Sequence, residues 1–372
     1  MPEHDVLIVG AGPVGLLLAC LLAQEGLQVT ICERRAGTDD RTRAIGIHRP
    51  GLDALDEAGV GGEVRAEGLR LAGGEARSRR RTVATLTFDP DRPVLVLPQP
   101  RTDALLRARL GALAPDALVV GCEVGEVHQR NDEVVVATET IEGSREVTAS
   151  MVVVADGVRS RLRGDLGIVW RPRPGRGSYS MLDVHDETPG DRAILHCEPD
   201  GLVECFPLPG GRRRWVVGEG DEEVGSAAGF RTAVRRRTGL DVDLPVGARP
   251  TSFIAAQHMA TRLHRGRVVL LGDAAHEVSP IGGQGMNLGW ADAVHLAEQL
   301  VRALPTRIPD LAAYDHRVRR AAARAGRRSR FYMSMGAPAP AAVVQGRELV
   351  MRALGSAPLR GWTTGLLTMR GI

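Results

Sequence analysis

The chain of 372 residues contains no lysine, so all 48 of its basic residues are arginines. This absence excludes chemistry that needs a lysine amine, such as a Schiff base, a phosphate-binding loop with its lysine, or a lysine general acid. The arginines nearly balance 45 acidic residues, and a net charge of +3 gives no argument for a nucleic-acid or membrane partner. The arginine-studded stretch at 317–330 is interpreted as a solvated helix face.

Cysteines are few and scattered, with neither a CxxC pair nor the spacing of a zinc site. An odd, dispersed set predicts reduced thiols in a cytoplasmic protein, and no bound metal. One long apolar stretch, 6–23, follows acidic residues instead of a basic segment, and glycines interrupt it. It predicts a buried strand and helix and no membrane span. The five cysteines are Cys20, Cys32, Cys122, Cys197 and Cys205.

A glycine-rich fingerprint follows the first apolar run, at 5–9. Gly10, Gly12 and Gly15 form G-x-G-x-x-G between this predicted strand and the next helix. The first glycine permits a tight turn, the second lets the backbone approach a pyrophosphate, and the third lets helix and strand pack closely. Glu33 ends the second strand, where a carboxylate can bind the ribose hydroxyls of adenosine. The unit predicts an adenine dinucleotide site, without separating NAD from FAD.

Two later apolar runs predict buried strands that each end beside an aspartate and a glycine: 151–155 before Asp156-Gly157, and 267–271 before Gly272-Asp273. Ligands gather at the carboxyl ends of strands in open α/β folds, so Asp273 can accept hydrogen bonds from sugar hydroxyls there. The segment 282–287 (GGQGMN) then opens a long helix. Its N–H groups and dipole suit the negative charge of a reduced flavin.

The pattern changes between these two strands. From about 169 to 261, alternating strands and turns predict a mostly antiparallel sheet inserted into the dinucleotide fold, and the chain is helical from about 285 onward. Helices are also predicted near 48–58, 102–111 and 228–237. We predict an α/β fold with a Rossmann-type cofactor domain, an inserted sheet domain and a helical C-terminus. The predicted limits are 1–75, 98–168 and 262–305 for the first, 76–97 and 169–261 for the second, and 306–372 for the third.

At several of these motifs the sequence resembles the FAD-dependent aromatic hydroxylases with the para-hydroxybenzoate hydroxylase fold, the group A flavoprotein monooxygenases. The resemblance covers roughly 4–305 and rests on the fingerprint, on VVVADGVRSRLR, and most specifically on GRVVLLGDAAHEVSPIGGQGMNLGWADAVHLAEQL. It implies bound FAD and a transient NADPH or NADH, which would bind without a domain of its own. The flavin would react with dioxygen to a C4a-hydroperoxide that hydroxylates an aromatic or polyketide-like small molecule.

The resemblance also implies which residues bind the cofactor. Asp156-Gly157 would serve both FAD and the nicotinamide, Asp273 the ribityl chain, and Gly283 to Asn287 the underside of the flavin ring, with Pro280 beside its reacting face. The full set predicted to bind cofactor is Gly10, Gly12, Pro13, Val14, Gly15, Glu33, Arg34, Arg43, Gln99, Arg101, Asp156, Gly157, Asp273, Pro280, Gly283, Gly285, Met286 and Asn287.

Other functions remain open on the same motifs: epoxidation, Baeyer–Villiger insertion, a flavin-dependent reductase or an NAD(P)-dependent dehydrogenase. A flavin halogenase is disfavoured, because that group uses a lysine and a tryptophan-rich motif that this chain lacks. A homodimer is also left open.

No catalytic base is assigned. Tyr179, Asp183 and His185 alternate on one predicted strand. Their side chains can face either the pocket or the outer side of the sheet. Family members that ionise a simple phenol can use paired tyrosines, and this chain has only three tyrosines. Their scarcity favours a substrate that is already acidic or polycyclic. His276 is predicted to have a structural role in its turn.

Overall fold

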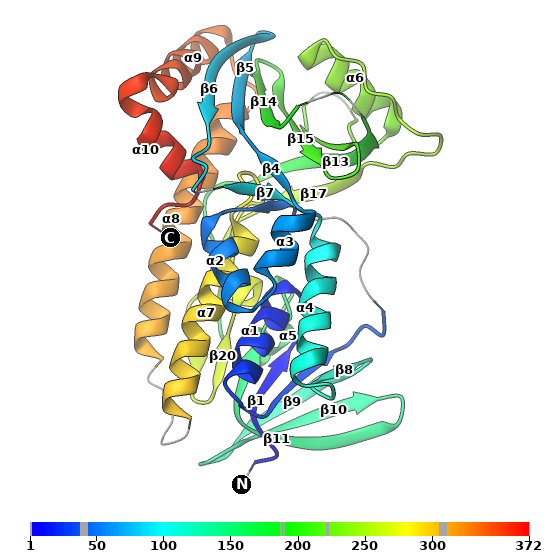
Figure 1. Cartoon of the computed structure of the whole chain (residues 1–372), viewed down its shortest axis with the longest axis vertical. Coiled ribbons are helices and arrows are strands. Elements are labelled where there is room, and N and C mark those ends of the chain that lie inside the picture. Colours follow the sequence, from blue (N-terminus) through cyan, green and yellow to red (C-terminus); the bar gives the residue numbers. More distant parts are fainter. Residues whose placement is uncertain are drawn as a thin grey trace.

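The computed structural model describes residues 2–371 except 38–43, 92, 187, 189, 221–222 and 305–310. Figure 1 shows two bodies stacked along the long axis, with the Rossmann-type sheet and its helices below and a second, twisted sheet above. The long helix α8 (Ala312–Gly336) runs beside both. This arrangement confirms the predicted fold class.

The lower sheet contains eight described strands, of which β20, β11, β1, β2 and β8 lie side by side and parallel. Parallel strands covered on both faces need continuous apolar runs, and the middle of this sheet is fully buried. The strands are β1 (His4–Val9), β2 (Val29–Glu33), β8 (Leu118–Val120), β9 (Glu123–Gln129), β10 (Val134–Thr140), β11 (Gly143–Val154), β19 (His264–Arg265) and β20 (Val268–Leu270).

Strand β11 starts well before the run predicted at 151–155. Its first half pairs antiparallel with β10, and only its second half enters the parallel sheet beside β1. Exposed polar residues at 143–146 hide this first half from a search for apolar runs.

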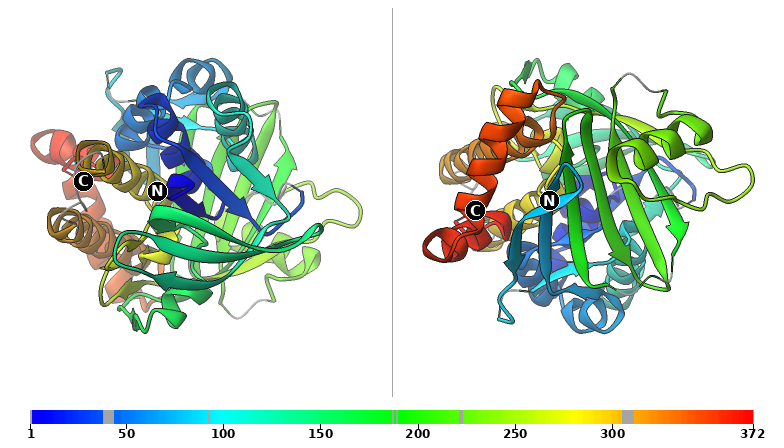
Figure 2. Two further views of the ribbon diagram at one scale, coloured as in Figure 1. Left: turned by 90° about the horizontal axis from the view of Figure 1, so that it is seen from below. Right: turned by 90° about the horizontal axis from the view of Figure 1, so that it is seen from above.

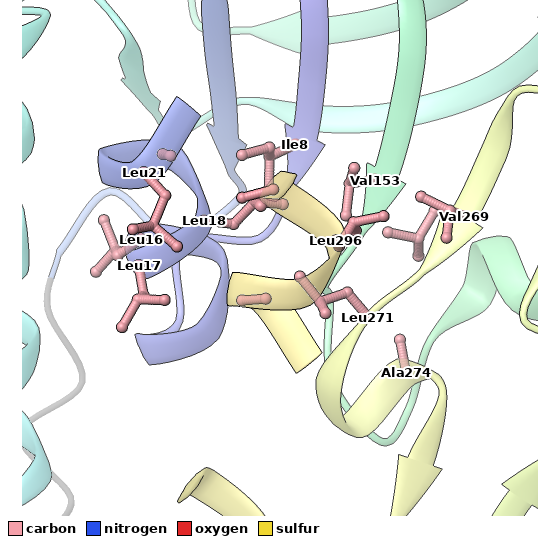
Figure 3. Packing of buried hydrophobic residues seen from close by; sticks show 14 of the residues in the cluster. Ile8, Leu16, Leu17, Leu18, Leu21, Val153, Val269, Leu271, Ala274 and Leu296 are labelled. Carbon is pink, nitrogen blue, oxygen red and sulfur yellow. The ribbon is translucent and has the colours of Figure 1, made fainter. Parts of the chain in front are cut away.

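Helix α1 packs on β1 and β2, α4 and α7 pack against α1, and together these elements build the main core. Figure 3 shows Leu18 of α1 close to Ile8, with Leu296 of α7 beside Val153. The helices of the lower body are α1 (Pro13–Gln24), α2 (Arg49–Glu57), α3 (Gly61–Glu67), α4 (Gln99–Leu113), α5 (Arg161–Asp165) and α7 (Gly285–Ala303), with a 3₁₀ turn η1 (Gly272–Ala274).

The upper sheet has seven described strands in the order β17-β13-β16-β15-β14-β5-β6, all antiparallel except for the β14–β5 pair. Helix α6 (Ala227–Thr238) packs on its outer face, while the C-terminal helices lie on the other side, as Figure 2 shows from above. The strands are β5 (Gly73–Ser78), β6 (Arg81–Thr87), β13 (Gly177–His185), β14 (Arg192–Glu198), β15 (Gly201–Leu208), β16 (Arg212–Gly218) and β17 (Thr251–Ala255).

Two details differ from the sequence prediction for this sheet. Strand β5 begins at Gly73, before the predicted limit at 76. The apolar segment at 93–97 contains β7 (Val94–Val96), which joins β3 (Gly46–Ile47) and β4 (Leu69–Leu71) in a small separate sheet. That small sheet packs against one end of the large one through the apolar cluster that includes Ile45 and Val96. The domain limits themselves stay a prediction.

A third small sheet, of β12 (Trp170–Pro172), β18 (His258–Ala260) and β21 (His276–Glu277), lies where the chain passes between the two bodies. Helix α8 touches both bodies, since it contacts α7 at one end and β14 and β15 at the other. Helices α9 (Ala341–Gly355) and α10 (Ala357–Leu367) then pack against β6. No helix in the described ranges is long and apolar enough to cross a membrane.

The hydroxyl of Tyr314 joins α8 to the lower sheet, because it donates to the carbonyl oxygen of Leu270 at 2.8 Å in the protein interior. We expect Tyr314→Phe to lower the free energy of unfolding by about 1–3 kcal/mol, since the buried carbonyl loses its donor. Tyr332→Phe is the matched control on the same helix: its buried hydroxyl finds no partner among the described residues, so its loss costs nothing. Equal melting temperatures for Tyr314→Phe and the wild type would contradict this account.

Candidate functional site

The glycine fingerprint occupies the turn between β1 and α1. Gly10 has a φ of +105°, and a Cβ there would lie 2.6 Å from the carbonyl oxygen of Ala155. A Cβ on Gly15 would lie 2.1 Å from the carbonyl oxygen of Gly10, so these two glycines are required by the fold itself. Gly12 differs, because a Cβ there would meet no atom within 4 Å. The open face of Gly12 fits the close approach of a pyrophosphate.

Helix α1 starts directly behind Gly12. Pro13 is its first residue, and no side chain caps its free N–H groups. Uncapped N–H groups and the helix dipole make such an end suitable for an anion. Val14 serves packing, since a Cβ on Gly289 of α7 would lie 2.7 Å from one of its methyl groups.

Glu33 lies buried at the end of β2, beside the glycine turn. Its Oε2 accepts from the Ala11 N–H at 2.9 Å, and its Oε1 accepts from the Arg35 N–H at 3.0 Å. Burial alone would raise the pKa of Glu33, but these hydrogen bonds and the Arg35 guanidinium hold it below its usual value. The carboxylate is therefore charged and fixed where ribose hydroxyls are predicted to bind. Arg34 lies exposed next to it, and Arg43 falls outside the described residues.

Helix α4 brings one further cation to this turn. The Arg107 guanidinium donates to the carbonyl oxygen of Ala11 at 3.2 Å. Gln99 and Arg107 are eight residues apart and lie on the same face of α4, with Asp103 between them. This spacing is the signal by which sequence reasoning could have found Arg107. The predicted Arg101 instead points to solvent and pairs with Glu67 at 2.7 Å.

Asp156, Gly157 and Asp273 come to the same edge, because β20, β11, β1 and β2 are neighbours that all end there. Oδ1 of Asp156 is buried without a hydrogen-bond partner among the described residues, and burial raises the pKa of this carboxyl. Beside it, Gly157 has a φ of +86° and open space around its Cα. An unpaired carboxylate oxygen next to an open glycine suits a ligand with hydroxyl donors.

The loop before α7 is held by the side chain of Asn287, which is completely buried. Its Oδ1 accepts from the His48 N–H at 2.8 Å, and its Nδ2 donates to the carbonyl oxygens of Gly46 and Gly283, both at 2.9 Å. The Asn287 amide is thus occupied in joining two loops. A direct contribution from Gly285, Met286 and Asn287 to the cofactor would come from main-chain N–H groups at the uncapped start of α7. The N–H of Gly283 already donates to the carbonyl oxygen of Pro280 at 2.9 Å.

Two buried histidines support this loop. Burial lowers the pKa of His48 to about 4, so its ring is neutral, and it bonds to the backbone of Gly282. His276 pairs with Asp292 of α7 at 2.6 Å in the interior, and this bond raises its pKa although burial alone would lower it. Its enclosure fits the structural role predicted for it. Pro280 lies exposed at the other end of the loop.

The inner face of the upper sheet meets this loop. Tyr179 belongs to the same apolar cluster as Ile281 and Met333, so it faces inward. Asp183 shares that face, but its carboxylate is paired with Arg214 at 2.9 Å, and His185 lies exposed at the strand end. The acid that sequence reasoning missed is Glu204 of β15, which lies buried on the same inner face. An acid within a wholly apolar strand was the available signal.

Comparisons with known proteins identify the family of this chain. Residues 3–329 match the protein family described as FAD binding domain. The chain is 32% identical over 318 residues to the 12-dehydrotetracycline 5-monooxygenase/anhydrotetracycline 6-monooxygenase of Streptomyces rimosus, covering 80% of this chain and 62% of that protein. The chain spans less than two thirds of the length of the first curated relatives it matches, between 56% and 62%.

Solved structures show the same fold. The anhydrotetracycline hydroxylase from Streptomyces rimosus superposes with a TM-score of 0.80 at 29% identity, over 99% of this chain and 76% of that one. The p-nitrophenol 4-monooxygenase from Pseudomonas putida DLL-E4 gives a TM-score of 0.89 at 24% identity, over 99% and 98% of the two chains, which shows the fold alone.

Gly12→Ala tests whether the open face of the turn binds the dinucleotide. We expect the unfolding temperature of the FAD-free protein to stay unchanged, while the affinity for FAD falls at least about tenfold, or about 1.4 kcal/mol. Gly15→Ala is the contrasting variant, because its Cβ would overlap the Gly10 carbonyl and disturb the fold itself. Flavin fluorescence titration and thermal unfolding separate the two effects. Unchanged FAD affinity in Gly12→Ala would refute the assignment.

Asn287→Asp tests the bridge between the two loops. A carboxylate cannot donate to the carbonyls of Gly46 and Gly283, and each buried acceptor left without a donor costs about 1–3 kcal/mol. We expect a lower free energy of unfolding and weaker FAD binding together, measured by chemical denaturation and FAD titration. Asn131→Asp makes the same change at an exposed turn and should alter neither. A stable Asn287→Asp variant that binds FAD normally would argue against the bridge.

Proposed function

The chain belongs to the FAD-binding family that includes the group A aromatic hydroxylases and monooxygenases, and on that premise we propose that it is itself such a monooxygenase. It uses NADPH or NADH and dioxygen to hydroxylate an aromatic or polyketide-like small molecule. The tetracycline-type relatives support a polycyclic aromatic substrate. The five cysteines are buried free thiols, in keeping with a cytoplasmic enzyme.

One observation carries the proposal. The open face of Gly12, the unpaired Oδ1 of Asp156 and the uncapped start of α7 all lie along one edge of the lower sheet, and the next loop packs on the upper sheet through Ile281. An extended dinucleotide needs an anion site for its pyrophosphate and acceptors for its sugar hydroxyls. It also needs a second helix end that stabilises negative charge on the flavin. The inner face of the upper sheet then borders the far end of the site.

The residues of the chain have separate tasks in the proposed reaction. Gly12 and the start of α1 bind the pyrophosphate, Glu33 accepts from the adenosine ribose, and Asp273 accepts from the sugar chain. When bound, FAD supplies the acceptor for hydride from the nicotinamide and the activation of dioxygen. The N–H groups at the start of α7 stabilise negative charge at that end of the site.

The upper sheet has the task of orienting the substrate and excluding water. Its inner face is apolar around Tyr179, Met181, Phe206, Val216 and Phe253. Water at the reacting centre would divert the reduced enzyme to hydrogen peroxide, so an apolar enclosure raises the yield of oxygenated product.

The defining test measures the visible spectrum of protein purified with added FAD, then NADPH and oxygen consumption with phenols and polycyclic quinones. We expect bound flavin, substrate-stimulated consumption of both reagents, and a product heavier by one oxygen atom. Catalase added in parallel shows how much oxygen is lost as peroxide.

Other results of the same test would favour a different enzyme class. NADPH oxidation with product but without oxygen uptake would indicate a reductase. Absence of bound flavin at excess FAD would refute the proposal and favour a nicotinamide dehydrogenase. Ring analysis of the product separates hydroxylation from epoxidation and Baeyer–Villiger insertion.

A further inference from the structure

Glu204 lies at the centre of the inner face of the upper sheet. It is opposite Leu195 of β14 on one side and Val216 of β16 on the other. Leu202 and Phe206, the next residues of β15 on the same face, are apolar as well. The side chain of Glu204 is therefore an isolated acid within an apolar surface, and it is only 4% exposed.

Within the described part of the chain, Glu204 makes no hydrogen bond and no ion pair. The buried carboxylate of Asp183 on the same face contrasts with it, because Arg214 contacts both of its oxygens, at 2.6 and 2.9 Å. Burying a charge without a partner is costly, and acids are rarely kept that way for stability. Burial raises the pKa of Glu204 to about 7. A buried acid with a raised pKa and no partner is a candidate for a functional group.

Glu204 is connected through apolar side chains to the loop at 278–284 before α7, called the flavin loop because it is predicted to lie beside the flavin ring. Val216 and Leu202 belong to the apolar cluster that contains Ile281, whereas Leu195 belongs to the cluster that contains Ile45. Ile281 follows Pro280, and Ile45 precedes Gly46, so the two clusters rest on the two loops that Asn287 joins. Glu204 lies between the clusters, on the face of the sheet turned toward both loops.

Other titratable groups face Glu204 from the surrounding elements. Tyr179 of β13 and Cys197 of β14 have raised pKa values, through burial first and through the charge of Glu204 second. The Asp183–Arg214 pair lies further along the face, and Tyr332 of α8 lies in the same cluster as Tyr179. At neutral pH neither tyrosine nor the thiol is charged. The carboxylate of Glu204 can thus accept a proton there without first breaking an ion pair.

We propose that Glu204 is the base that ionises a phenolic substrate bound between this face and the flavin loop. The inference rests on the proposed function. The O–H bond of the phenol breaks, its proton moves to the Glu204 carboxylate, and the electron pair stays on the substrate oxygen. The resulting phenolate is electron-rich at the ring carbon that is to be oxygenated, and the neutral acid returns its proton to solvent after product leaves. The substrate class is therefore a weakly acidic phenol carried on an apolar ring system.

The kinetic test compares wild type and Glu204→Gln on phenols of increasing acidity, measured as kcat/KM for oxygenated product. Loss of a positioned base costs about 10²- to 10⁴-fold, so we expect a loss of that size for weakly acidic phenols. The loss should shrink steadily and disappear for phenols that are already ionised at the assay pH. A loss of equal size for every phenol, or no loss at all, would overturn the proposal.

The matched control is Glu198→Gln, which neutralises an equally buried acid of the same sheet. Glu198 accepts from the Arg80 N–H and lies at the end of β14, away from the proposed ring site. Any effect of this variant should be independent of phenol acidity. FAD content of both variants must equal that of the wild type.

A second measurement does not depend on turnover. The FAD-loaded wild type should bind a phenol more tightly than its methyl ether, and Glu204→Leu should abolish that preference, as measured by calorimetry. If wild type oxygenates no phenol but shows this preference, the proposed function fails while Glu204 remains the phenol acceptor. If the preference is absent, or survives in Glu204→Leu, the assignment of Glu204 fails whatever the enzyme oxygenates.

The pH dependence of the free energy of unfolding tests independently whether Glu204 is buried without a partner. The folded-state pKa of Glu204 is raised from about 4.5 to about 7, so folding binds a proton in that window and the free energy of unfolding falls as pH rises through it. Glu204→Gln should therefore melt at a higher temperature than wild type at pH 8, and the difference should vanish below pH 4.5. A variant that is less stable at pH 8 would show that the carboxylate has a stabilising partner, contrary to the proposal.

Discussion

One buried amide joins the parts of this molecule that would meet a cofactor. Asn287 ties the start of α7 to the strand and turn at 46–48 and to Gly283, and all its polar atoms are satisfied within the protein. The bridge also dictates the residue facing it: a Cβ on Gly51 of α2 would lie 2.2 Å from Asn287 Oδ1. Because these bonds are shielded from water, breaking one leaves a buried group without a partner. The three hydrogen bonds of Asn287 therefore hold the two loops together.

Close packing between two helices also fixes the geometry of the Rossmann unit. Helices α1 and α7 come near enough for Gly289 to fit against Val14, and Trp290 of α7 donates to the carbonyl oxygen of Pro13 at 3.0 Å. The helix that would face the flavin is thereby fixed to the helix that would face the pyrophosphate. A rigid distance between these two anion sites is what recognition of an extended dinucleotide requires.

The upper sheet shows how burial can be used in two ways. At one end of its inner face, the charges of Asp183 and Arg214 compensate each other in an ion pair. Glu204 has no such partner within the described residues, and burial raises its pKa. One face of the sheet thus has an acid with a structural role, Asp183, and an acid with a proposed catalytic role, Glu204.

The sequence by itself determined the Rossmann unit, the inserted sheet and the glycine turn that is predicted to bind the pyrophosphate. These features depend on local constraints, namely the spacing of Gly10, Gly12 and Gly15, the apolar runs of the parallel strands and the start of each helix. The predicted helices at 48–58, 102–111 and 228–237 correspond to α2, α4 and α6 for the same reason. The pairing of strands was harder to predict from the sequence, because the parallel pair of β5 and β14 joins residues more than a hundred positions apart.

Only the tertiary structure decided what each polar side chain does. It turned Tyr179 inward, paired Asp183 with Arg214, left His185 exposed and occupied the Asn287 amide with other loops. It also brought Arg107 to the glycine turn and left Glu204 without a partner in the described chain. The physical reason is that the cost of a buried polar group depends on atoms supplied by distant segments, and a pattern along one strand or helix carries no record of them.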